Sequence, residues 1–241
     1  MRAAITRGFA VVPALLCCAV FAASAQAAGP ISDTVRVAPM PSAVVSSGSR
    51  AFVISSNLDD NYSPAGPGVV TAINPETMAI LGTVETGGNN PTTAAVGPDG
   101  LVYVVNTEDY FSDGSVAIID PQTLQRVALV PGFGSGPGGI FIDSHGIAYV
   151  SSFSYGTIVW DTNTRTFVRG PDNPVCAKAS GFCRGAPDAH PDGNGQLYQV
   201  FFGSPSQNLP ARIFVYQGSS YTLKDSVATG QGPISLDIRT F

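Results

Sequence analysis

Prolines recur along this chain at a nearly constant spacing. The members of the series are 50, 46, 50 and 46 residues apart, and each heads a segment with the same pattern: Pro41, Pro91, Pro137, Pro187 and Pro233. A period of about 20 to 50 residues is typical of folds built from one repeated unit. The chain is therefore predicted to be a repeat protein, and each later motif is interpreted by its place in the repeat.

Each repeat contains four short segments with the pattern of β-strands. In the second repeat, residues 92–96 and 101–105 are joined by a tight Pro-Asp-Gly turn. A third and a fourth strand pattern follow, joined by an Asx-type turn that starts at Asp120; equivalent turns start at Asn74 and Asp161. Four antiparallel strands per repeat, with no helical periodicity between them, are typical of a β-propeller blade.

The predicted fold class is therefore all-β, a small β-propeller of four four-stranded blades plus a partial closing blade, in one domain of residues 31–241. The blades cover residues 41–90, 91–136, 137–186 and 187–232. The closing blade combines an outer strand from residues 31–40 with an inner strand from residues 233–241 and lacks two middle strands. We expect either a small ring with imperfect closure or an open arc whose free edge pairs with a second copy as a homo-oligomer.

The first 27 residues have the features of a secretory signal peptide. Two arginines precede the apolar run of residues 9–21, and Ala25 and Ala27 offer small residues for cleavage. A membrane helix over residues 9–25 is the alternative, but the run is short and the small residues after it favour cleavage. We expect an exported protein, periplasmic or secreted, with no membrane insertion after the signal is removed.

Charge and cysteine content narrow the partners and the compartment. Outside the signal peptide, 10 basic residues face 17 acidic ones. Nucleic acid is not expected as a partner, because phosphate binding requires a basic surface. The same region keeps two cysteines, Cys176 and Cys183, which we expect to form a local disulfide in an oxidising compartment. A metal pair is the alternative, but no nearby Cys or His cluster completes a tetrahedral set.

Several segments resemble the YVTN-type β-propeller repeat: Gly-Leu-Val-Tyr-Val-Val-Asn at 100–106, Gly-Ile-Ala-Tyr-Val-Ser-Ser at 146–152 and Val-Ala-Ile-Ile-Asp-Pro-Gln-Thr at 116–123. That family is related to NHL-repeat, virginiamycin B lyase-like and lactonase-like propellers. The resemblance spans about residues 31–241 and implies a propeller that serves as a binding module, a scaffold or an enzyme. Rings of the family usually have more blades than the four predicted here.

In a propeller, the loops that follow the second strand of each blade lie on one face with the loops between blades. Aromatic side chains there offer flat contact area for a sugar ring, a peptide or another protein, although packing between blades is their alternative role. The candidate ligand-binding residues on this face are Asp59, Asp60, Tyr62, Asn106, Glu108, Asp109, Tyr110, Phe133, Phe153, Tyr155 and His190. Residues 203–208 are expected on the same face.

Carboxylates in two of these loops are candidate ligands for a metal ion. Asp59, Asp60, Asp109 and Asp113 offer hard oxygen atoms of the kind that Ca²⁺ binds. The alternative is that they are turn residues of solvated loops, since neither loop has the alternate-residue spacing of an EF-hand. No cofactor is required by the sequence, and Ca²⁺ or another divalent cation is the candidate.

His190 is expected on an inner strand near the channel, two residues after Asp188. Such a pair can serve acid–base chemistry, bind a ligand or stabilise a turn. The lyase-like and lactonase-like propellers hold a divalent ion with several inner His, Glu, Asp or Asn side chains, and this chain does not match that set. The sequence favours a protein that binds a protein, peptide or carbohydrate and is not an enzyme. A divalent-metal-dependent lactonase-like hydrolase or lyase is the alternative.

Overall fold

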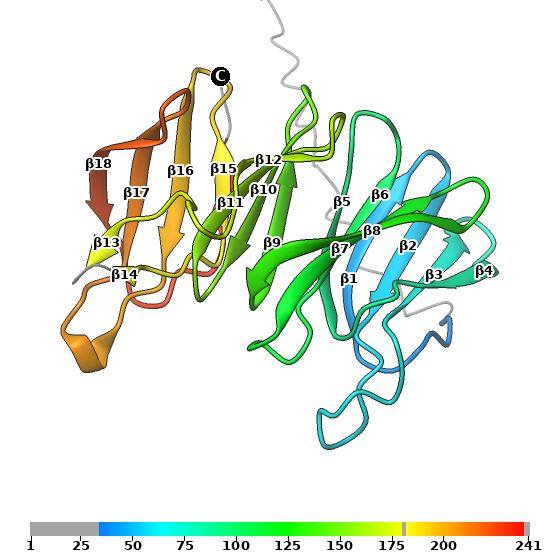
Figure 1. The fold of residues 1–241 in the computed structure, drawn as a ribbon. Coiled ribbons are helices and arrows are strands. Elements are labelled where there is room, and N and C mark those ends of the chain that lie inside the picture. Colours follow the sequence, from blue (N-terminus) through cyan, green and yellow to red (C-terminus); the bar gives the residue numbers. More distant parts are fainter. Residues whose placement is uncertain (1–33, 180–181, 239–241) are drawn as a thin grey trace, which may run out of the picture. The chain divides into compact units, whose positions relative to one another are not determined.

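The fold is all-β, as predicted. In a computed structural model, which describes residues 34–179 and 182–238, four four-stranded antiparallel sheets follow one another along the chain (Figure 1). The neighbouring strands of each sheet are also neighbours in sequence. The prediction of a small propeller of four blades is confirmed, and we number the sheets blades 1 to 4. The predicted signal peptide lies outside the described residues.

The strands of each blade run from an inner to an outer position. Blade 1 consists of β1 (Pro41–Ser47), β2 (Arg50–Ser55), β3 (Val69–Asn74) and β4 (Ala79–Glu85). Blade 2 consists of β5 (Pro91–Val96), β6 (Val102–Asn106), β7 (Asp113–Asp120) and β8 (Gln125–Ser135). Blade 3 consists of β9 (Pro137–Ile142), β10 (Ile147–Ser152), β11 (Gly156–Asp161) and β12 (Thr166–Arg169). Blade 4 consists of β15 (Ala189–Pro191), β16 (Gln196–Phe201), β17 (Arg212–Gln217) and β18 (Thr222–Ala228).

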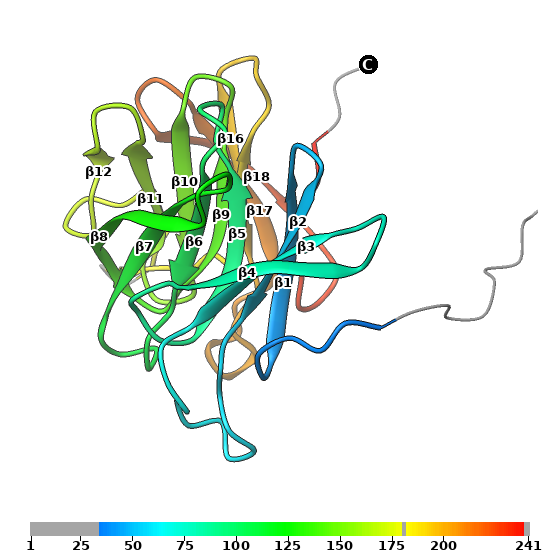
Figure 2. The same cartoon turned by 90° about the vertical axis from the view of Figure 1, so that its right-hand side faces the viewer.

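Each blade is strongly twisted. In blade 1 the outer strand β4 runs at a steep angle to the inner strand β1 (Figure 2). This follows from the right-handed twist of β-strands, which accumulates across the sheet. The other regular elements are a short hairpin of β13 (Lys178–Ala179) and β14 (Phe182–Cys183) and a 3₁₀ turn, η1 (Pro205–Gln207). No helix in the described part of the chain is long and apolar enough to cross a membrane.

Apolar side chains fill the joints between consecutive blades. Because successive side chains of a strand point to opposite faces, a blade can pack on a neighbour with each face, as blades 2 and 3 do. Three buried clusters result, between blades 1 and 2, blades 2 and 3, and blades 3 and 4. At the second of these joints, Trp160 of β11 is fully buried, and its ring meets those of Tyr103 and Phe133 edge-on at 6.0 and 5.5 Å between centroids.

The recurring prolines mark these joints. Gly68, just before β3, lies so close to the ring of Pro91 that a Cβ atom on the glycine would collide with it, and Gly114 lies against Pro137 in the same way. The backbone oxygen of each proline also accepts a hydrogen bond from a hydroxyl group of the preceding blade. The donors are Ser56 Oγ for Pro91, at 2.8 Å, and Thr107 Oγ1 for Pro137, at 2.6 Å. The first two joints thus share one motif, made of a proline, a glycine and a hydroxyl group. At the third joint the equivalent residues differ, because Ser152 Oγ donates to the backbone oxygen of Ser135 and Gly156 lies against Val175 and Cys176.

An inserted segment, residues 170–186, lies between β12 and blade 4. The backbone of Val175 pairs with that of Thr157 in β11, with N···O distances of 2.8 and 2.9 Å. The predicted disulfide between Cys176 and Cys183 is present and closes the hairpin that follows. Its presence is consistent with a non-reducing, exported environment.

The joint between blades 3 and 4 contains a buried amide whose hydrogen bonds are satisfied. Gln199 of β16 is 1 % exposed. Its Nε2 donates to Thr157 Oγ1 at 2.8 Å and to the backbone oxygen of Val175 at 2.7 Å, while its Oε1 accepts from the Tyr216 hydroxyl at 3.0 Å. Because buried polar groups are tolerated when they are fully paired, this network attaches the inserted segment to two blades at once.

The two segments expected to form a partial closing blade belong to no sheet in the described chain. Residues 34–37 and 232–238 have no strand assignment. The physical reason is that an inner and an outer strand cannot pair directly when the two middle strands between them are missing. Among the described residues, no apolar cluster joins blade 4 to blade 1.

Substitution of Trp160 should test the importance of the joint between blades 2 and 3. We expect Trp160→Ala to destabilise the fold by about 3–5 kcal/mol, because it leaves a cavity among fully buried side chains. Trp160→Phe should cost much less, since it keeps an aromatic ring and removes an Nε1 atom that has no hydrogen-bond partner in the structure. Urea unfolding followed by far-UV circular dichroism measures both. Equal destabilisation by the two changes would contradict this account.

Three blades share one turn between their third and fourth strands. In blade 2, Asp120 Oδ1 accepts hydrogen bonds from the backbone N–H groups of Gln122 and Thr123, at 2.7 and 3.2 Å. Asp161 makes the equivalent pair of bonds in blade 3, and Asn74 makes it in blade 1 with an uncharged side chain. These backbone hydrogen bonds hold the pKa of Asp120 and Asp161 below the usual value of 3.8.

These two turns should make stability depend on pH in acid. Since the folded-state pKa is lowered, the carboxylates contribute stability above about pH 4, and this contribution is lost as the pH falls through the folded-state pKa. The double variant Asp120→Asn, Asp161→Asn should keep both turns, as Asn74 does, and flatten this dependence. Asp120→Ala with Asp161→Ala should lower stability at neutral pH as well. Urea midpoints measured between about pH 3 and pH 6 distinguish the three proteins, and an unchanged acid slope in the Asn variant would refute the assignment.

Candidate functional site

Two loops that follow second strands, residues 56–68 of blade 1 and 107–112 of blade 2, meet at a pocket of about 300 Å³. Four of the predicted ligand-binding residues line this pocket. Tyr62 comes from the first loop, and Glu108, Asp109 and Tyr110 come from the second. The residues that line it are Leu58, Tyr62, Ser63, Pro64, Asn90, Glu108, Asp109 and Tyr110. Asp60 is exposed two residues before Tyr62.

Carboxylates organise both loops from within. Asp59 Oδ1 accepts hydrogen bonds from the backbone N–H groups of Asn61 and Ser63, at 2.8 and 2.9 Å. Asp109 accepts from the N–H groups of Ser112 and Phe111 at 2.6 and 3.0 Å, and from the Ser112 hydroxyl at 3.0 Å. These bonds, led by the one from Ser112 N–H, hold the pKa of Asp109 below its usual value. The carboxylate is therefore ionised at neutral pH, and the loop keeps one shape.

Glu108 connects this loop to the segment between β4 and β5, which joins blade 1 to blade 2. Its Oε2 accepts from the backbone N–H and the side-chain amide of Asn89, at 3.1 and 3.0 Å. The adjacent Asn90 donates from Nδ2 to the backbone oxygen of Glu108 at 3.2 Å. Glu108 and Tyr110 both have positive φ, 58° and 70°, a conformation that turns the chain sharply twice within three residues.

Large aromatic side chains project from these loops into solvent. Phe111 is 89 % exposed, Tyr62 is 75 % exposed and Tyr110 is 57 % exposed. On blade 3, Phe153 is 57 % exposed in the equivalent loop. Apolar side chains that are exposed singly are ordinary, but a group of them beside fixed carboxylates indicates a binding surface.

Three residues predicted on this face are less exposed than expected. For Asn106 and Phe133 the prediction is corrected, because both side chains are buried. Asn106 is fully buried, and its Nδ2 donates to Ser115 Oγ at 3.0 Å, because it is still part of β6. Phe133 is also fully buried, since it packs on Trp160 in the joint between blades 2 and 3. Tyr155 is half-buried and lies against Gly134. Phe133 therefore has the alternative role considered for the aromatic residues, which is packing between blades.

The four aspartates proposed as metal ligands are not brought together as one set. Asp113 is used elsewhere, because its two carboxylate oxygens accept from the N–H groups of Gly132 and Gly134 at 3.0 and 2.7 Å. Asp59 and Asp109 are occupied within their own loops. The described residues contain no group of three or more His, Cys, Asp or Glu side chains placed to hold a metal ion.

His190 pairs with Asp188, as the sequence suggested. The Nε2 atom of His190 lies 3.1 Å from Asp188 Oδ1, and the imidazole packs on the ring of Phe141 at 4.5 Å between centroids. The second oxygen of Asp188 accepts from the backbone N–H of Leu236 at 3.0 Å. The pair therefore attaches the C-terminal segment to the inner strand of blade 4, apart from the residues that line the pocket between blades 1 and 2.

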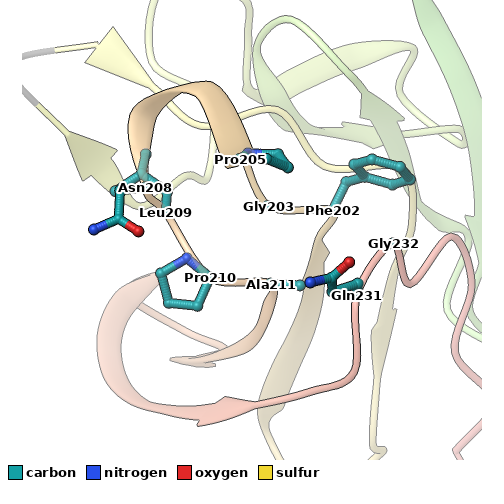
Figure 3. Close-up of a pocket in the computed structure, with 9 residues that line it drawn as sticks. All are labelled: Phe202, Gly203, Pro205, Asn208, Leu209, Pro210, Ala211, Gln231 and Gly232. Atoms are coloured by element: carbon teal, nitrogen blue, oxygen red, sulfur yellow. The ribbon is translucent and has the colours of Figure 1, made fainter.

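Sequence analysis did not identify a larger pocket on blade 4 (Figure 3). Its volume is about 720 Å³, and it lies between the loop that joins β16 to β17 and the segment after β18. Figure 3 shows the ring of Phe202 and the side chains of Pro205, Pro210 and Gln231 around an open centre. Part of this loop, residues 203–208, was expected on the binding face. The two prolines and Gly203 were the available sequence signals of a rigid loop, and in the structure Gly203 has a positive φ of 93°.

Comparison with solved structures supports the fold. The chain is similar to Kuenenia stuttgartiensis hydrazine synthase, with 24 % identity and a TM-score of 0.59 over 83 % of this chain and 52 % of that one. It is also similar to the Swd1 (Cps50) β-propeller domain of Myceliophthora thermophila, with 13 % identity and a TM-score of 0.61 over 83 % and 59 %. The structure of U3-55K matches with 11 % identity and a TM-score of 0.60 over 82 % and 54 %.

At these identities the likeness concerns the fold alone. This chain spans between 52 % and 59 % of the length of those three structures. No protein-family model matches the chain, and no curated protein matches it. The comparisons therefore establish a β-propeller, and the site must be interpreted from its own residues.

Proposed function

We propose that this chain is an exported β-propeller of the YVTN type that binds a protein or peptide partner. The contact region, here called the acidic aromatic surface, consists of Asp59, Asp60, Tyr62, Glu108, Asp109, Tyr110 and Phe111. The observation that carries the proposal is the exposure of three aromatic side chains around a pocket whose carboxylates are held by backbone hydrogen bonds. Export is supported by the disulfide between Cys176 and Cys183.

The chemistry of the surface favours a basic partner with apolar side chains. Neither loop, residues 56–68 or 107–112, contains a Lys or an Arg, whereas the two loops together contain four Asp or Glu residues. Aromatic rings bind Lys and Arg side chains by cation–π contact, and carboxylates pair with the same cations. A preformed loop loses little conformational entropy on binding, which favours affinity.

The same surface could accept a sugar through its aromatic rings, and the metal-dependent hydrolase or lyase remains the enzymatic alternative. A sugar site gains most from ring faces combined with polar groups free to bond hydroxyls. Here, Asp59 and Asp109 already accept two or more hydrogen bonds each from their own loops. We therefore give the peptide partner priority and use glycans as a comparison in the test.

A random peptide library displayed on phage tests the proposal. We expect peptides rich in Lys, Arg and aromatic residues to be selected on the unmodified protein. The double variant Tyr62→Ser, Phe111→Ser should bind the selected peptides at least about 30-fold less tightly, since loss of even one central aromatic contact costs about 2 kcal/mol. Both side chains are exposed, so the fold should tolerate the change.

Val168→Ser is a matched control, because Val168 is 49 % exposed on the outer strand β12 and lies outside the surface. It should leave peptide affinity unchanged. The peptide assignment would be contradicted if the selected peptides bound the Tyr62→Ser, Phe111→Ser variant as tightly as the Val168→Ser control. It would also be contradicted if the only ligands found were glycans on a glycan array. Affinities are measured by isothermal titration calorimetry at two salt concentrations. Binding should weaken with salt if the carboxylates contribute.

A further inference from the structure

One aromatic position recurs in the second strand of every blade. It is occupied by Phe52, Tyr103, Tyr149 and Tyr198, as the strand registers show. The first three are 0 %, 1 % and 8 % exposed, because each packs against the blade that follows. Tyr198 is half-buried. The residue in blade 4 therefore has the chemistry of an inter-blade contact, but among the described residues no further four-stranded sheet packs on it.

The outer part of this face of blade 4 is also exposed, whereas Val200 and Val215, which lie on the same face, are buried. Ile213 is paired with Val227 on β18, which is 56 % exposed. The corresponding residues of blades 1 and 2 are covered. Val70 and Val116 belong to the buried clusters, and their cross-strand partners Val84 and Val130 pack against the same clusters. We call the face formed by Tyr198, Ile213 and Val227 the trailing face.

Part of the face of blade 1 that is turned away from blade 2 is also exposed, although Ser55 and Thr71 on the same face are buried. Val44 is 65 % exposed, and Val53, its cross-strand partner, is half-buried. The position of Val53 corresponds in blade 2 to Val104, which is completely buried against blade 1. Val69 on β3 is half-buried as well. We call the face formed by Val44, Val53 and Val69 the leading face.

We propose that the trailing face of one copy binds the leading face of a second copy, so that two chains form a head-to-tail dimer. The second copy then supplies its own trailing face to the leading face of the first. Two identical heterologous contacts related by a two-fold rotation give a closed assembly. Together the chains supply eight blades, which is within the usual range of about four to eight for propellers.

The repeat itself identifies a second copy as the occupant. Three times within the chain, a face of the trailing type packs on a face of the leading type and forms a buried apolar joint. The two open faces are the unpaired halves of that same joint. An unrelated partner would have to imitate a blade, whereas a second copy presents one already. This inference does not depend on the acidic aromatic surface.

The C-terminal segment lies where the first strand of the next blade belongs. Pro233 continues the proline series, so it is the counterpart of Pro41 at the start of β1. Leu236 and Ile238 line a cavity with Tyr198 and Ile213 on the trailing face. Ile234 in the same segment is 64 % exposed, so the cover is thin. We infer that this segment occupies the place of the second copy's β1 and is displaced on dimerisation.

Sedimentation velocity and light scattering of the purified protein test the proposal. We expect a dimer across the concentrations at which the protein is soluble. Val44→Asp on the leading face and Val227→Asp on the trailing face should each weaken dimerisation at least tenfold, since each places a charge in both joints. Both residues are exposed in the single chain, so the fold should tolerate either change. A monomer at every concentration would overturn the proposal.

A mixing experiment distinguishes a head-to-tail dimer from a symmetric contact of one face with itself. In a mixture of the Val44→Asp and Val227→Asp proteins, one of the two joints contains only unsubstituted faces. The mixture should therefore dimerise more tightly than either variant alone. Failure to do so, or a loss of dimer with only one of the two substitutions, would overturn the head-to-tail arrangement.

Two further variants complete the test. Val127→Asp is the matched control, because Val127 is 46 % exposed on the outer strand β8 of an interior blade. It should leave the dimer intact. Leu236→Asp should tighten dimerisation, since it releases the C-terminal segment from the trailing face. A weaker dimer with Leu236→Asp would show that the segment is part of the joint and would refute its displacement.

Discussion

The structure depends on one contact, the burial of each sheet face against the next sheet. A single four-stranded sheet of this kind has apolar residues on both faces, and neither face can remain in water without a large cost. Phe52 and Tyr103 illustrate how this is solved, because each is buried only by the blade that follows it. The stability of every interior blade is therefore a property of its neighbours as much as of its own sequence.

The joints also place the candidate site. The backbone of Pro91 accepts hydrogen bonds from Ser42 Oγ and Ser56 Oγ, both at 2.8 Å, where blade 1 meets blade 2. The loops that begin just after Ser56 and Thr107 are consequently brought to one place, where Tyr62 and Tyr110 line the same pocket. The surface arises from a structural requirement, because the hydroxyl groups of Ser56 and Thr107 fix where each loop begins and the exposed aromatic side chains follow them.

Much of the fold could be predicted from the sequence because its signals are local and repeated. The Asx turns at Asn74, Asp120 and Asp161 and the proline series locate the four sheets before any tertiary contact is known. The site was harder to predict, since Phe133 and Phe153 cannot be distinguished by pattern. Both are aromatic residues in Gly- and Ser-rich segments, yet one is fully buried and the other is 57 % exposed. Which of them reaches solvent depends on Trp160, whose ring meets Phe133 from the next blade.

The two proposals have a combined consequence for affinity. In a closed ring built from equivalent joints, the loops that follow second strands all emerge on one face. A head-to-tail dimer would thus present two acidic aromatic surfaces in the same direction, and a partner with two basic segments would bind both. The second contact would then be intramolecular, with an effective concentration set by the length of chain between the segments. Weak contacts at exposed residues such as Phe111 and Tyr62 would suffice for tight binding, and this accords with the small volume of the pocket on this surface, about 300 Å³.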